Sequence, residues 1–530
     1  MNADSHYALT DRLTNQPVQV AVIDIGATSI RMQVAEIKSD GMVRKLEAFS
    51  QAVSLGKDSF DKGKIQKQTI EDCVHVLKIY RSKLDEYGIT RPDQIRVIAT
   101  SGIKEASNRL AMQDRIFIST GFEIEPFDEA ELHRVTYLGV QPFISAHTEL
   151  FSGRNVACEV GGGTTEMLVL HGSDVVFSTT FRLGALRLRK SFQGTDVSRQ
   201  KIRPLMEASI LQIIERSDED VLDEPADCYI AMGSDIRFAA HEIPNQRVDD
   251  NMLEIDVNEL DAFIDDIFTK TPDKIVTQYH FSLPDAESFG PGLLTHLMVA
   301  KRVGAKRFLV ANVNLRDGLI QEMAQGRRWS ASIHEQIVRN ARQLGEKYQY
   351  AEDHAVHVAK LAGSLFDQLE PVHQMPGRFR AILELAALLH EIGQYVSNRS
   401  LHKHSLYLIR NSEIFGIGAH EKELVALVAR YHRRATPQPN HDGFSRLNRK
   451  DRVTVAKLAA LLRIANALDS SRAQRIQKLD CLIRGAGTEV LLQTDVSADL
   501  SMEQIKLKLV KPFFEDIFGC NVVLQNVSDS

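Results

Sequence analysis

Two short glycine turns, flanked by carboxylates and hydroxyls, are the parts of this 530-residue chain best suited to chemistry. The first reads Asp24-Ile25-Gly26-Ala27-Thr28-Ser29, and the second reads Glu159-Val160-Gly161-Gly162-Gly163-Thr164-Thr165-Glu166. A glycine turn lets backbone N–H groups approach phosphate oxygens because no Cβ stands in the way. A neighbouring carboxylate can hold Mg²⁺ directly or through water. The pair therefore indicates a phosphate site, whereas either turn alone fits a tight hairpin equally well.

Apolar strands must position both turns. β-Branched and apolar residues flank the turns over 18–37 and 156–170, which is the pattern of a β-hairpin. Helical spacing over 69–87 is followed by a buried strand at 95–100, so strands and helices alternate in this half. The repeated hairpin is a weak internal duplication. It predicts two similar α/β lobes that face one another across a cleft.

After about residue 325 the pattern changes to amphipathic helices. The helical segments are 331–348, 353–369, 378–390, 422–432 and 453–468. From Cys481 onward, strand-like and helix-like segments return. The expected domains are a flexible tail at 1–17, lobe I at 18–145, lobe II at 146–325, a helical domain at 326–480 and a small C-terminal α/β domain at 481–530.

Composition places the chain among soluble globular proteins, with 43% hydrophobic and 25% charged residues. A net charge of −6 provides no overall attraction to nucleic acid or to an anionic membrane. The five cysteines form no C-x-x-C pair, which argues against a disulfide framework and a thiolate zinc site. There is no apolar signal region and no run of about 18 apolar residues. We therefore expect a cytoplasmic protein with no membrane partner and no specific nucleic-acid partner.

Seven segments, in order, resemble the motifs of the exopolyphosphatase/guanosine pentaphosphate phosphohydrolase (Ppx/GppA) family. They are VIDIGATSIRM, RVIATSGIKEASNR, EIEPFDEAELHRVTYLGV, VACEVGGGTTEMLVL, TTFRLGALRLRKSF, YIAMGSDIRFAA and NVNLRDGL. Farther on, AALLHEIGQYVSNRS and ALVARYHRR resemble that family's helical domain. The resemblance implies a two-lobed α/β fold of the actin-like/sugar-kinase/Hsp70 ATPase type, followed by an all-α HD-type domain and a small C-terminal α/β domain.

The resemblance also implies Mg²⁺-dependent removal of terminal phosphate from inorganic polyphosphate or from guanosine pentaphosphate. Mg²⁺, or another divalent cation, would be held by Asp24, Glu159 and Glu166. The phosphate contacts implied are Gly26, Thr28, Ser29, Arg109, Gly161, Gly162, Gly163 and Thr164. For Arg109, which ends the segment ATSGIKEASNR, a surface ion pair is an equally good interpretation.

The sequence departs from the family at the residue that activates water. The family's E-E-A-R motif reads here Glu131-Leu132-His133-Arg134, and leucine cannot accept a proton. Three outcomes stay open: Glu131 or Glu129 replaces the missing base, the metal alone activates water, or the reaction is lost. We expect Glu131 and Glu166 to be the catalytic residues.

A second departure lies before the last part of lobe II. The family's T-G-G reads here Gly233-Ser234-Asp235, which brings a negative charge to a place where phosphate would approach.

The helical half offers a set of metal-ligand residue types. An HD-type site requires a His, a His-Asp pair and a later Asp from different helices. This chain has His354, His390-Glu391 and Asp469, with Glu391 in place of the usual aspartate. Two interpretations stay open: packed structural histidines, or a second metal site.

Two functions from different classes follow. The first is an exopolyphosphatase-like hydrolase of polyphosphate or guanosine pentaphosphate. The alternative is a catalytically weakened regulatory protein that binds polyphosphate or nucleotide, which Leu132 favours. A kinase or ATPase of the same fold is a third interpretation. The long helical half beside a cleft-bearing half favours a homodimer.

Overall fold

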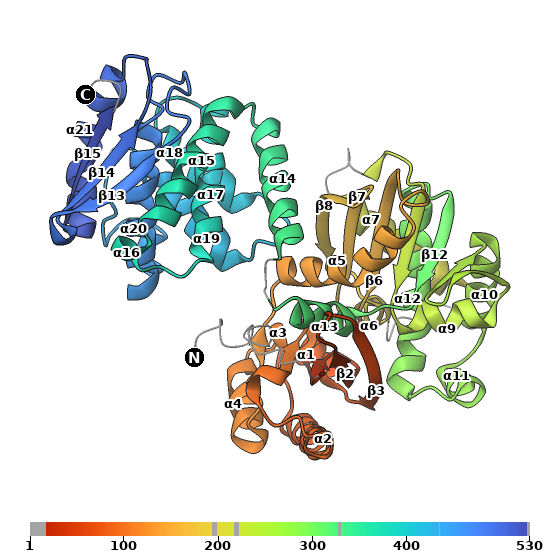
Figure 1. The fold of residues 1–530 in the computed structure, drawn as a ribbon. Coiled ribbons are helices and arrows are strands. Elements are labelled where there is room, and N and C mark those ends of the chain that lie inside the picture. Colours follow the sequence, from red (N-terminus) through yellow and green to blue (C-terminus); the bar gives the residue numbers. More distant parts are fainter. Residues whose placement is uncertain (1–16, 193–198, 217–221, 327–329, 434, 527–530) are drawn as a thin grey trace. The chain divides into compact units, whose positions relative to one another are not determined.

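The computed structural model describes residues 17–192, 199–216, 222–326, 330–433 and 435–526 (Figure 1). The contacts divide the chain into two compact units, 1–330 and 331–530. Within the described ranges, no helix has both the length and the apolar character that crossing a membrane requires. The tail expected at 1–17 lies, apart from Pro17, outside the described residues. The finer domain boundaries expected inside each unit stay predictions.

The first sheet of the first unit has the strand order β3-β2-β1-β4-β5. Its strands are β1 (Val18–Ile25), β2 (Ser29–Ile37), β3 (Val43–Ala52), β4 (Ile95–Ala99) and β5 (Glu125–Pro126). Strand β1 pairs antiparallel with β2 and parallel with β4. The first predicted hairpin and the buried strand at 95–100 are therefore confirmed.

Both faces of this sheet are buried, which explains why β1 reads as a continuous apolar run. Ala21 and Ile23 face one apolar cluster and Val20 and Val22 face the other. The helices between these strands and the second sheet are α1 (Leu55–Lys62), α2 (Lys67–Glu86), α3 (Ser101–Lys104), α4 (Arg109–Thr120) and α5 (Glu129–Ala146). Helix α2 confirms the helix predicted over 69–87.

The second sheet has the order β10-β11-β12-β9-β6-β7-β8. Its strands are β6 (Arg154–Val160), β7 (Thr165–His171), β8 (Asp174–Phe181), β9 (Cys228–Met232), β10 (Asn245–Asp249), β11 (Met252–Ile255) and β12 (Arg307–Ala311). Strands β6 and β7 form the second predicted hairpin, and β6 pairs in parallel with β9.

The helices that follow β8 are α6 (Ala185–Ser191), α7 (Arg199–Ile214), α9 (Ser234–Glu242), α10 (Val257–Thr269), α11 (Pro272–Tyr279), α12 (Leu283–Arg302) and α13 (Leu315–Gln325). Helix α13 packs against α5 and β1, although its residues belong to the range expected for lobe II. The last helix of the unit thus returns to the first sheet.

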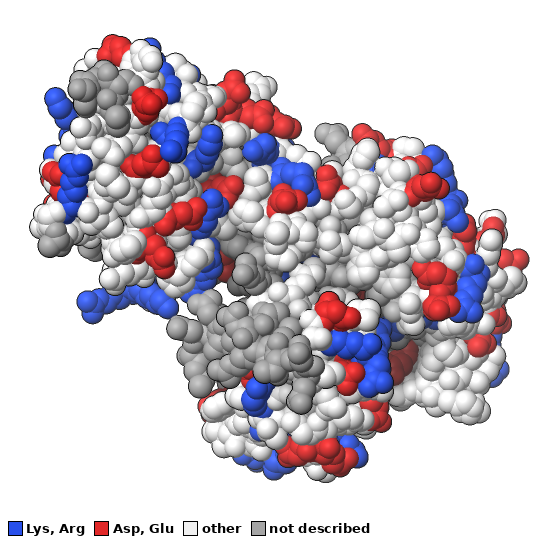
Figure 2. All heavy atoms as spheres, in the orientation of Figure 1, with Lys and Arg blue, Asp and Glu red and all other residues white. Residues whose placement is uncertain are grey.

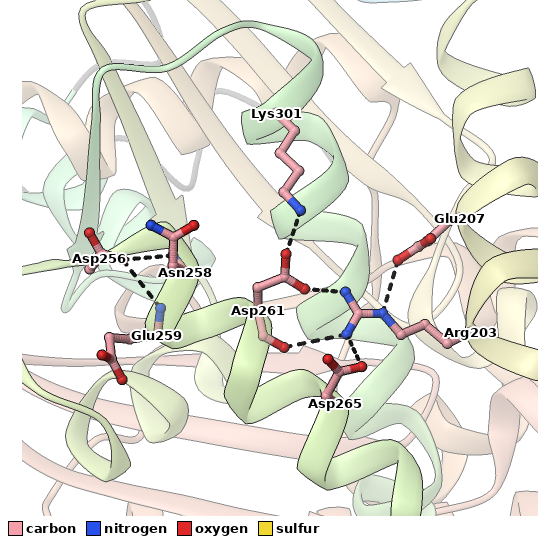
Figure 3. Close-up of polar contacts among 8 residues, drawn as sticks. All are labelled: Arg203, Glu207, Asp256, Asn258, Glu259, Asp261, Asp265 and Lys301. Atoms are coloured by element: carbon pink, nitrogen blue, oxygen red, sulfur yellow. Dashed lines mark hydrogen bonds and ion pairs between the residues drawn. The ribbon is translucent and has the colours of Figure 1, made fainter. Parts of the chain in front are cut away.

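A polar network joins three of these helices on the outside of the second sheet (Figure 3). Arg203 of α7 pairs with Asp261 and Asp265 of α10 and with Glu207 of its own helix. Lys301 of α12 reaches Asp261 at 2.5 Å. Side chains from three helices therefore share one carboxylate, which fixes the helices relative to each other.

The second unit begins with helices, as expected. They are α14 (Ala331–Lys347), α15 (Glu352–Gln368), α16 (Glu370–His373), α17 (Phe379–Leu389), α18 (Leu401–Asn411), α19 (Ala419–Arg430) and α20 (Arg449–Ala467). A three-stranded sheet follows, made of β13 (Asp480–Arg484), β14 (Glu489–Thr494) and β15 (Asn521–Asn526), with α21 (Ser501–Phe518) between its last two strands. The five predicted helices are confirmed, whereas α18 and β13 were not predicted.

Charged side chains of both signs lie interspersed on the face drawn in Figure 2. The net charge of −6 is therefore not gathered into a single acidic field on that face.

Candidate active site

The turn between β1 and β2 holds the first predicted chemical group. Asp24 lies directly opposite Arg31 in the strand register. The N–H of Gly26 donates to the carbonyl of Ser29 at 2.9 Å and closes the turn. The side chain of Asp24 is 12% exposed, so the carboxylate is held near the end of a buried strand.

The turn between β6 and β7 repeats this geometry. Glu159 lies opposite Glu166, and the N–H of Gly161 donates to the carbonyl of Thr164 at 2.8 Å. The internal duplication predicted from the sequence is therefore present in the backbone hydrogen bonds. Beside the turn the two hairpins differ in charge, because the position of Arg31 in the first is that of Glu166 in the second.

Both turns line one cleft of about 120 Å³ in the first unit. The predicted site residues that line it are Asp24, Gly26, Thr28, Ser29, Glu159, Gly161, Gly162, Thr164 and Glu166. The structure thus brings together residues that are separated by more than a hundred positions in sequence.

The second turn rests on the start of helix α6. The N–H of Ala185 donates to Gly161 O at 2.9 Å, and the N–H of Leu186 donates to Gly162 O at 3.0 Å. Gly163, which does not line the cleft, accepts a hydrogen bond from Arg187 Nε at 3.0 Å. The turn therefore points carbonyls toward α6, and Gly163 acts in this contact rather than in the cleft wall.

Burial raises the pKa of the three cleft carboxyls that the sequence predicted as metal ligands, Asp24, Glu159 and Glu166. It raises the pKa of Glu166 to about 8, while the hydrogen bond from Thr164 opposes the shift. Burial and the negative charge of Asp24 raise the pKa of Glu159 to about 6. Burial also raises the pKa of Asp24, against the attraction of Arg316. A cation in the cleft would favour the ionised form of all three carboxyls.

Three arginines that the sequence analysis did not assign also line the cleft, namely Arg31, Arg237 and Arg316. Arg316 Nη1 lies 3.3 Å from Asp24 Oδ2, and Arg31 Nη2 donates to Ser234 Oγ at 3.4 Å. The signal for Arg31 was its place opposite Asp24 in the hairpin. Arg316 gave no such signal, because 292 positions separate it from its partner.

The start of α13 aims Arg316 into the cleft. Asn314 and Asp317 form a capping box around the first turn of this helix. Asp317 also accepts a hydrogen bond from Gln33 Nε2 at 2.6 Å and pairs with Lys45 Nζ at 2.9 Å. These contacts tie the helix to β2 and β3, so Arg316 is held by two neighbouring elements.

Glu131 does not line the cleft. It lies in the first turn of α5, where its carboxylate accepts a hydrogen bond from the N–H of Asp128 at 3.3 Å. Leu132 does line the cleft and is 9% exposed. The expectation that Glu131 is the base therefore lacks support. The carboxylate of Glu131 caps helix α5, and Leu132, not Glu131, lines the cleft.

Arg109 also lies outside the cleft wall. It is exposed in the first turn of α4, so the structure does not bring it to the phosphate site expected from the resemblance. Asp235 does line the cleft, and burial raises its pKa to about 6, against the attraction of Arg31. The predicted acidic residue is therefore present in the wall.

The cleft carboxylates fit a divalent cation. Asp24 Oδ1 is buried and has no hydrogen-bond partner among the described residues, which leaves an oxygen of the kind that Mg²⁺ prefers. Asp24, Glu159 and Glu166 do not bring three ligand atoms within 4.8 Å of one another. Mg²⁺ usually keeps several waters and binds only one or two carboxylates, so a Mg²⁺ site does not require three such atoms close together.

The second unit contains the other predicted group. His354, His390 and Glu391 each offer a ligand atom, and these atoms lie within 4.8 Å of one another. Asp469 does not join them. It accepts a hydrogen bond from His354 Nδ1 at 2.7 Å, so Asp469 orients a histidine instead of completing the group as expected.

Comparisons with known proteins give a consistent family. The Ppx/GppA phosphatase family model matches residues 33–326, and the Ppx/GppA phosphatase domain III model matches 338–510. The chain is 21% identical over 468 residues to the guanosine-5'-triphosphate,3'-diphosphate pyrophosphatase of Photobacterium profundum, covering 84% of this chain and 85% of that protein. The protein of the same name from Vibrio vulnificus is 24% identical, covering 84% and 87% of the two chains.

Among solved structures, an exopolyphosphatase from Cytophaga hutchinsonii is similar with a TM-score of 0.52 and 19% identity, covering 58% of this chain and 98% of that one. An exopolyphosphatase-like protein is similar with a TM-score of 0.51, at 18% identity, covering 58% and 97%. These likenesses show the fold alone, which is the mixed α/β fold described above. Since the first family model spans more than half of the chain, this protein belongs to the Ppx/GppA phosphatase family.

Proposed function

We propose that this protein is a Mg²⁺-dependent phosphohydrolase that removes terminal phosphate from inorganic polyphosphate, from guanosine pentaphosphate, or from both. The relatives carry the names guanosine-5'-triphosphate,3'-diphosphate pyrophosphatase and exopolyphosphatase. The observation that carries the proposal is the pair of matched glycine hairpins that face one cleft.

The cleft combines donors and cations for a phosphate chain. The glycine turns offer N–H groups, and Thr28 and Ser29 offer hydroxyls. Arg31 and Arg316 supply positive charge to the cleft wall. Fixed donors of this kind stabilise charge that develops on phosphoryl oxygens.

Asp24 and Glu159 are the residues that would hold Mg²⁺. When bound there, the ion would neutralise charge on the phosphoryl oxygens. The raised pKa values of these carboxyls support a cation at this position, because ionising them in the cleft is unfavourable without one.

Glu166, rather than Glu131, is the base in this proposal. The oxygen of a water molecule attacks the terminal phosphorus, the anhydride P–O bond breaks, and the proton of the water passes to the Glu166 carboxylate. Thr164 Oγ1 donates to Glu166 Oε1 at 2.7 Å, which leaves the other oxygen to accept the proton. A base is most effective when its pKa lies near the working pH, and about 8 meets that condition.

A second function is favoured by Leu132. This residue lines the cleft, and it packs in an apolar cluster with Val20, Val22 and Leu319. If Glu166 does not replace the missing base, the protein binds polyphosphate or guanosine pentaphosphate and acts as a regulator with little turnover.

The test measures phosphate release from polyphosphate, guanosine pentaphosphate and ATP with Mg²⁺. Glu166→Gln should lower kcat by about 10²–10⁴-fold, the usual contribution of general-base catalysis. Glu131→Gln is the matched control and should keep kcat within a few-fold of the parent.

The outcomes separate the interpretations. Equal loss in both variants would point to general damage near the cleft and count against Glu166 as the base. Tight polyphosphate binding without turnover, with activity appearing in Leu132→Glu, would favour the regulatory function. Release from ATP alone would favour an ATPase.

We also propose, from the sequence arguments above, a cytoplasmic homodimer whose second unit has an HD-type helical core. Light scattering coupled to size-exclusion chromatography measures the oligomeric state. A mass of one chain at all concentrations would exclude the dimer.

A further inference from the structure

The second unit holds buried histidines that the proposed reaction does not use. His354 lies in α15, His390 directly follows α17, and Glu391 is the next residue. His354 is 5% exposed, His390 is 0% exposed, and the side chain of Glu391 is 11% exposed. Within the described part of the chain, this is the only group of three metal-ligand side chains whose ligand atoms lie within 4.8 Å of one another.

The orientation of each histidine ring is fixed by its Nδ1 atom. His354 Nδ1–H donates to Asp469 Oδ2 at 2.7 Å, and His390 Nδ1–H donates to the carbonyl of Ala387 at 2.6 Å. A ring whose Nδ1 carries the proton presents the Nε2 lone pair as an acceptor. A histidine that binds a metal through one ring nitrogen usually donates its other ring N–H to a carboxylate or a backbone carbonyl, as both rings do here.

The Nε2 atoms of His354 and His390 are buried and have no hydrogen-bond partner among the residues that the structure describes. Buried polar atoms normally find a partner, and one without a partner calls for an explanation. Two such atoms beside a carboxylate provide a nitrogen, nitrogen and oxygen donor set.

Another histidine of the same unit shows that burial alone does not leave a ring in this state. His373 is 0% exposed. Its Nε2–H donates to the carbonyl of Phe366 at 2.7 Å, and its Nδ1 accepts from the N–H of Met375 at 2.9 Å. His373 therefore shows that this unit can satisfy both nitrogens of a buried histidine, whereas His357 Nε2 and His432 Nε2 are, like those of His354 and His390, buried without a partner among the described residues.

We propose that His354 Nε2, His390 Nε2 and the carboxylate of Glu391 bind one transition-metal dication such as Zn²⁺. Two imidazoles and one carboxylate are a common set for Zn²⁺ and related ions, and a poor set for Mg²⁺. Atoms bound to one ion at about 2.1 Å lie at most about 4.2 Å apart. The group needs to contract only slightly from its spacing of up to 4.8 Å.

The neighbours of the group agree with this assignment. Glu391 Oε2 lies 2.6 Å from Arg472 Nη2, and a carboxylate has a second oxygen that a metal can use. His432 follows α19, is 2% exposed, and has its ring centroid 4.9 Å from that of His390. It closes the site from that helix and lies outside the ligand set.

The inference goes beyond the proposed function and does not depend on it. The donor atoms belong to the unit 331–530, whereas the hydrolytic cleft belongs to the unit 1–330. If the metal-binding proposal fails, the proposed hydrolytic function is not affected, and the reverse also holds.

The experiment uses the full chain without added affinity-tag histidines. The protein is equilibrated with Zn²⁺ in excess Mg²⁺, dialysed, and analysed for metal content per chain. We expect about one Zn²⁺ per chain in the parent, and at least a tenfold weaker affinity in His390→Gln and in Glu391→Gln, because each removes a ligand. Circular dichroism checks that each variant is folded.

Two controls locate the ion. His373→Gln removes a buried histidine of the same unit and should retain Zn²⁺, and Asp24→Asn alters the cleft and should also retain it. Co²⁺ in place of Zn²⁺ should give visible absorption that Glu391→Gln changes and His373→Gln does not.

The proposal is overturned if the parent keeps no Zn²⁺ after dialysis. It is also overturned if the folded Glu391→Gln and His390→Gln variants bind as tightly as the parent, or if Asp24→Asn loses the ion.

Discussion

At the scale of single residues, burial decides which cleft carboxylate can take a proton. Glu166 is 7% exposed, and its pKa of about 8 follows mainly from that burial. Glu131, close to the sequence position of the family base, is committed to the cap of α5. Two glutamates that look alike in sequence therefore have different roles in the fold.

The raised pKa of Glu166 predicts the pH dependence of hydrolysis. A base must be deprotonated to accept a proton, so kcat/KM should rise with pH. Because a bound cation favours the ionised carboxylate, the rise should level off below the pKa of about 8 that Glu166 has in the cation-free cleft. The profile is measured from about pH 6 to about pH 9.5 with polyphosphate or guanosine pentaphosphate in excess Mg²⁺. Activity that falls as the pH rises toward 8 would contradict the assignment of Glu166.

Sequence reasoning found the cleft carboxylates because they lie beside glycines in a recognisable turn. It missed Arg316, since a contact across 292 positions depends on how α13 returns to the first sheet. It placed Glu131 in the site because motif alignment cannot show that a side chain serves as a helix cap. The residue types beside each turn were therefore predictable from the sequence, whereas the use of a carboxylate as a helix cap was not.

At the scale of elements, the contact between α6 and the second glycine turn is the tightest part of the site. A Cβ on Gly184 would lie 2.3 Å from Gly163 N and 2.4 Å from Gly162 O. The backbone of Gly184 is extended, with φ −119°, so the constraint is steric and not conformational.

Gly184→Ala should therefore displace the turn and lower phosphate release by at least tenfold, while the first unit stays folded. Small misplacements of catalytic groups cost about 10²-fold in rate. The control is Gly139→Ala in α5, where the nearest atoms to a Cβ lie at 3.9 Å. Equal activity of the two variants would show that the turn tolerates movement.

A buried ion triad links α5, α13 and β4. Glu322 is 0% exposed and pairs with Arg134 Nη1 at 2.8 Å and Arg96 Nη1 at 2.7 Å. Burial opposes ionisation of Glu322, but the two arginines outweigh it and lower its pKa. The lowered pKa means that its stabilising effect is present above the ordinary carboxyl pKa and is lost as the pH falls through the folded value.

Glu322→Gln should lower the free energy of unfolding by about 3–5 kcal/mol, the usual cost of removing one partner of a buried ion pair. The loss concerns mainly the pair with Arg134, because Arg96 keeps its pair with Glu125. The control is Glu71→Gln, whose exposed pair with Arg115 should contribute about 0–1 kcal/mol. Urea unfolding at neutral pH measures both. Similar losses for the two variants would mean that the triad adds nothing beyond a surface pair.

Sequence patterns predicted most of the elements that have regular apolar spacing and missed β13 and α18. Both hairpins and the long helices show regular apolar spacing. Strand β13 is mostly exposed, so no buried face marked it. Helix α18 does bury an apolar face with Leu401, Leu406 and Ile409, and the sequence analysis overlooked that spacing. Strand β13 is stabilised by pairing with β14, and α18 packs against α19. Neither contact can be deduced from the residues of the element alone.

At the scale of the whole molecule, the cleft carboxyls lie in the unit 1–330, and His354, His390 and Glu391 lie in the unit 331–530. The cleft carboxyls have folded pKa values above their ordinary ones, so the folded state binds more protons than the unfolded state. Their contribution to stability therefore falls as the pH rises from about 4.5 toward 8. A bound cation would offset this loss.

Mg²⁺ should thus raise the thermal unfolding midpoint more near pH 8 than near pH 6. These two pH values correspond to the pKa of Glu166, about 8, and the pKa of Glu159, about 6. A ligand at about ten times its Kd adds about 1.4 kcal/mol to the free energy of unfolding. Differential scanning calorimetry with and without Mg²⁺ measures the gain, and Asp24→Asn should reduce it. An equal gain at both pH values, or in the variant, would place the ion elsewhere.

The two matched hairpins carry opposite charges at one equivalent position beside the turn. Their turns are closed by the same backbone hydrogen bond, but Arg31 in the first hairpin occupies the position of Glu166 in the second. If Glu166 is the base, as proposed above, the hairpin that carries Arg31 faces the anion and the hairpin that carries Glu166 takes the proton, so two turns of the same backbone geometry would have different parts in the reaction.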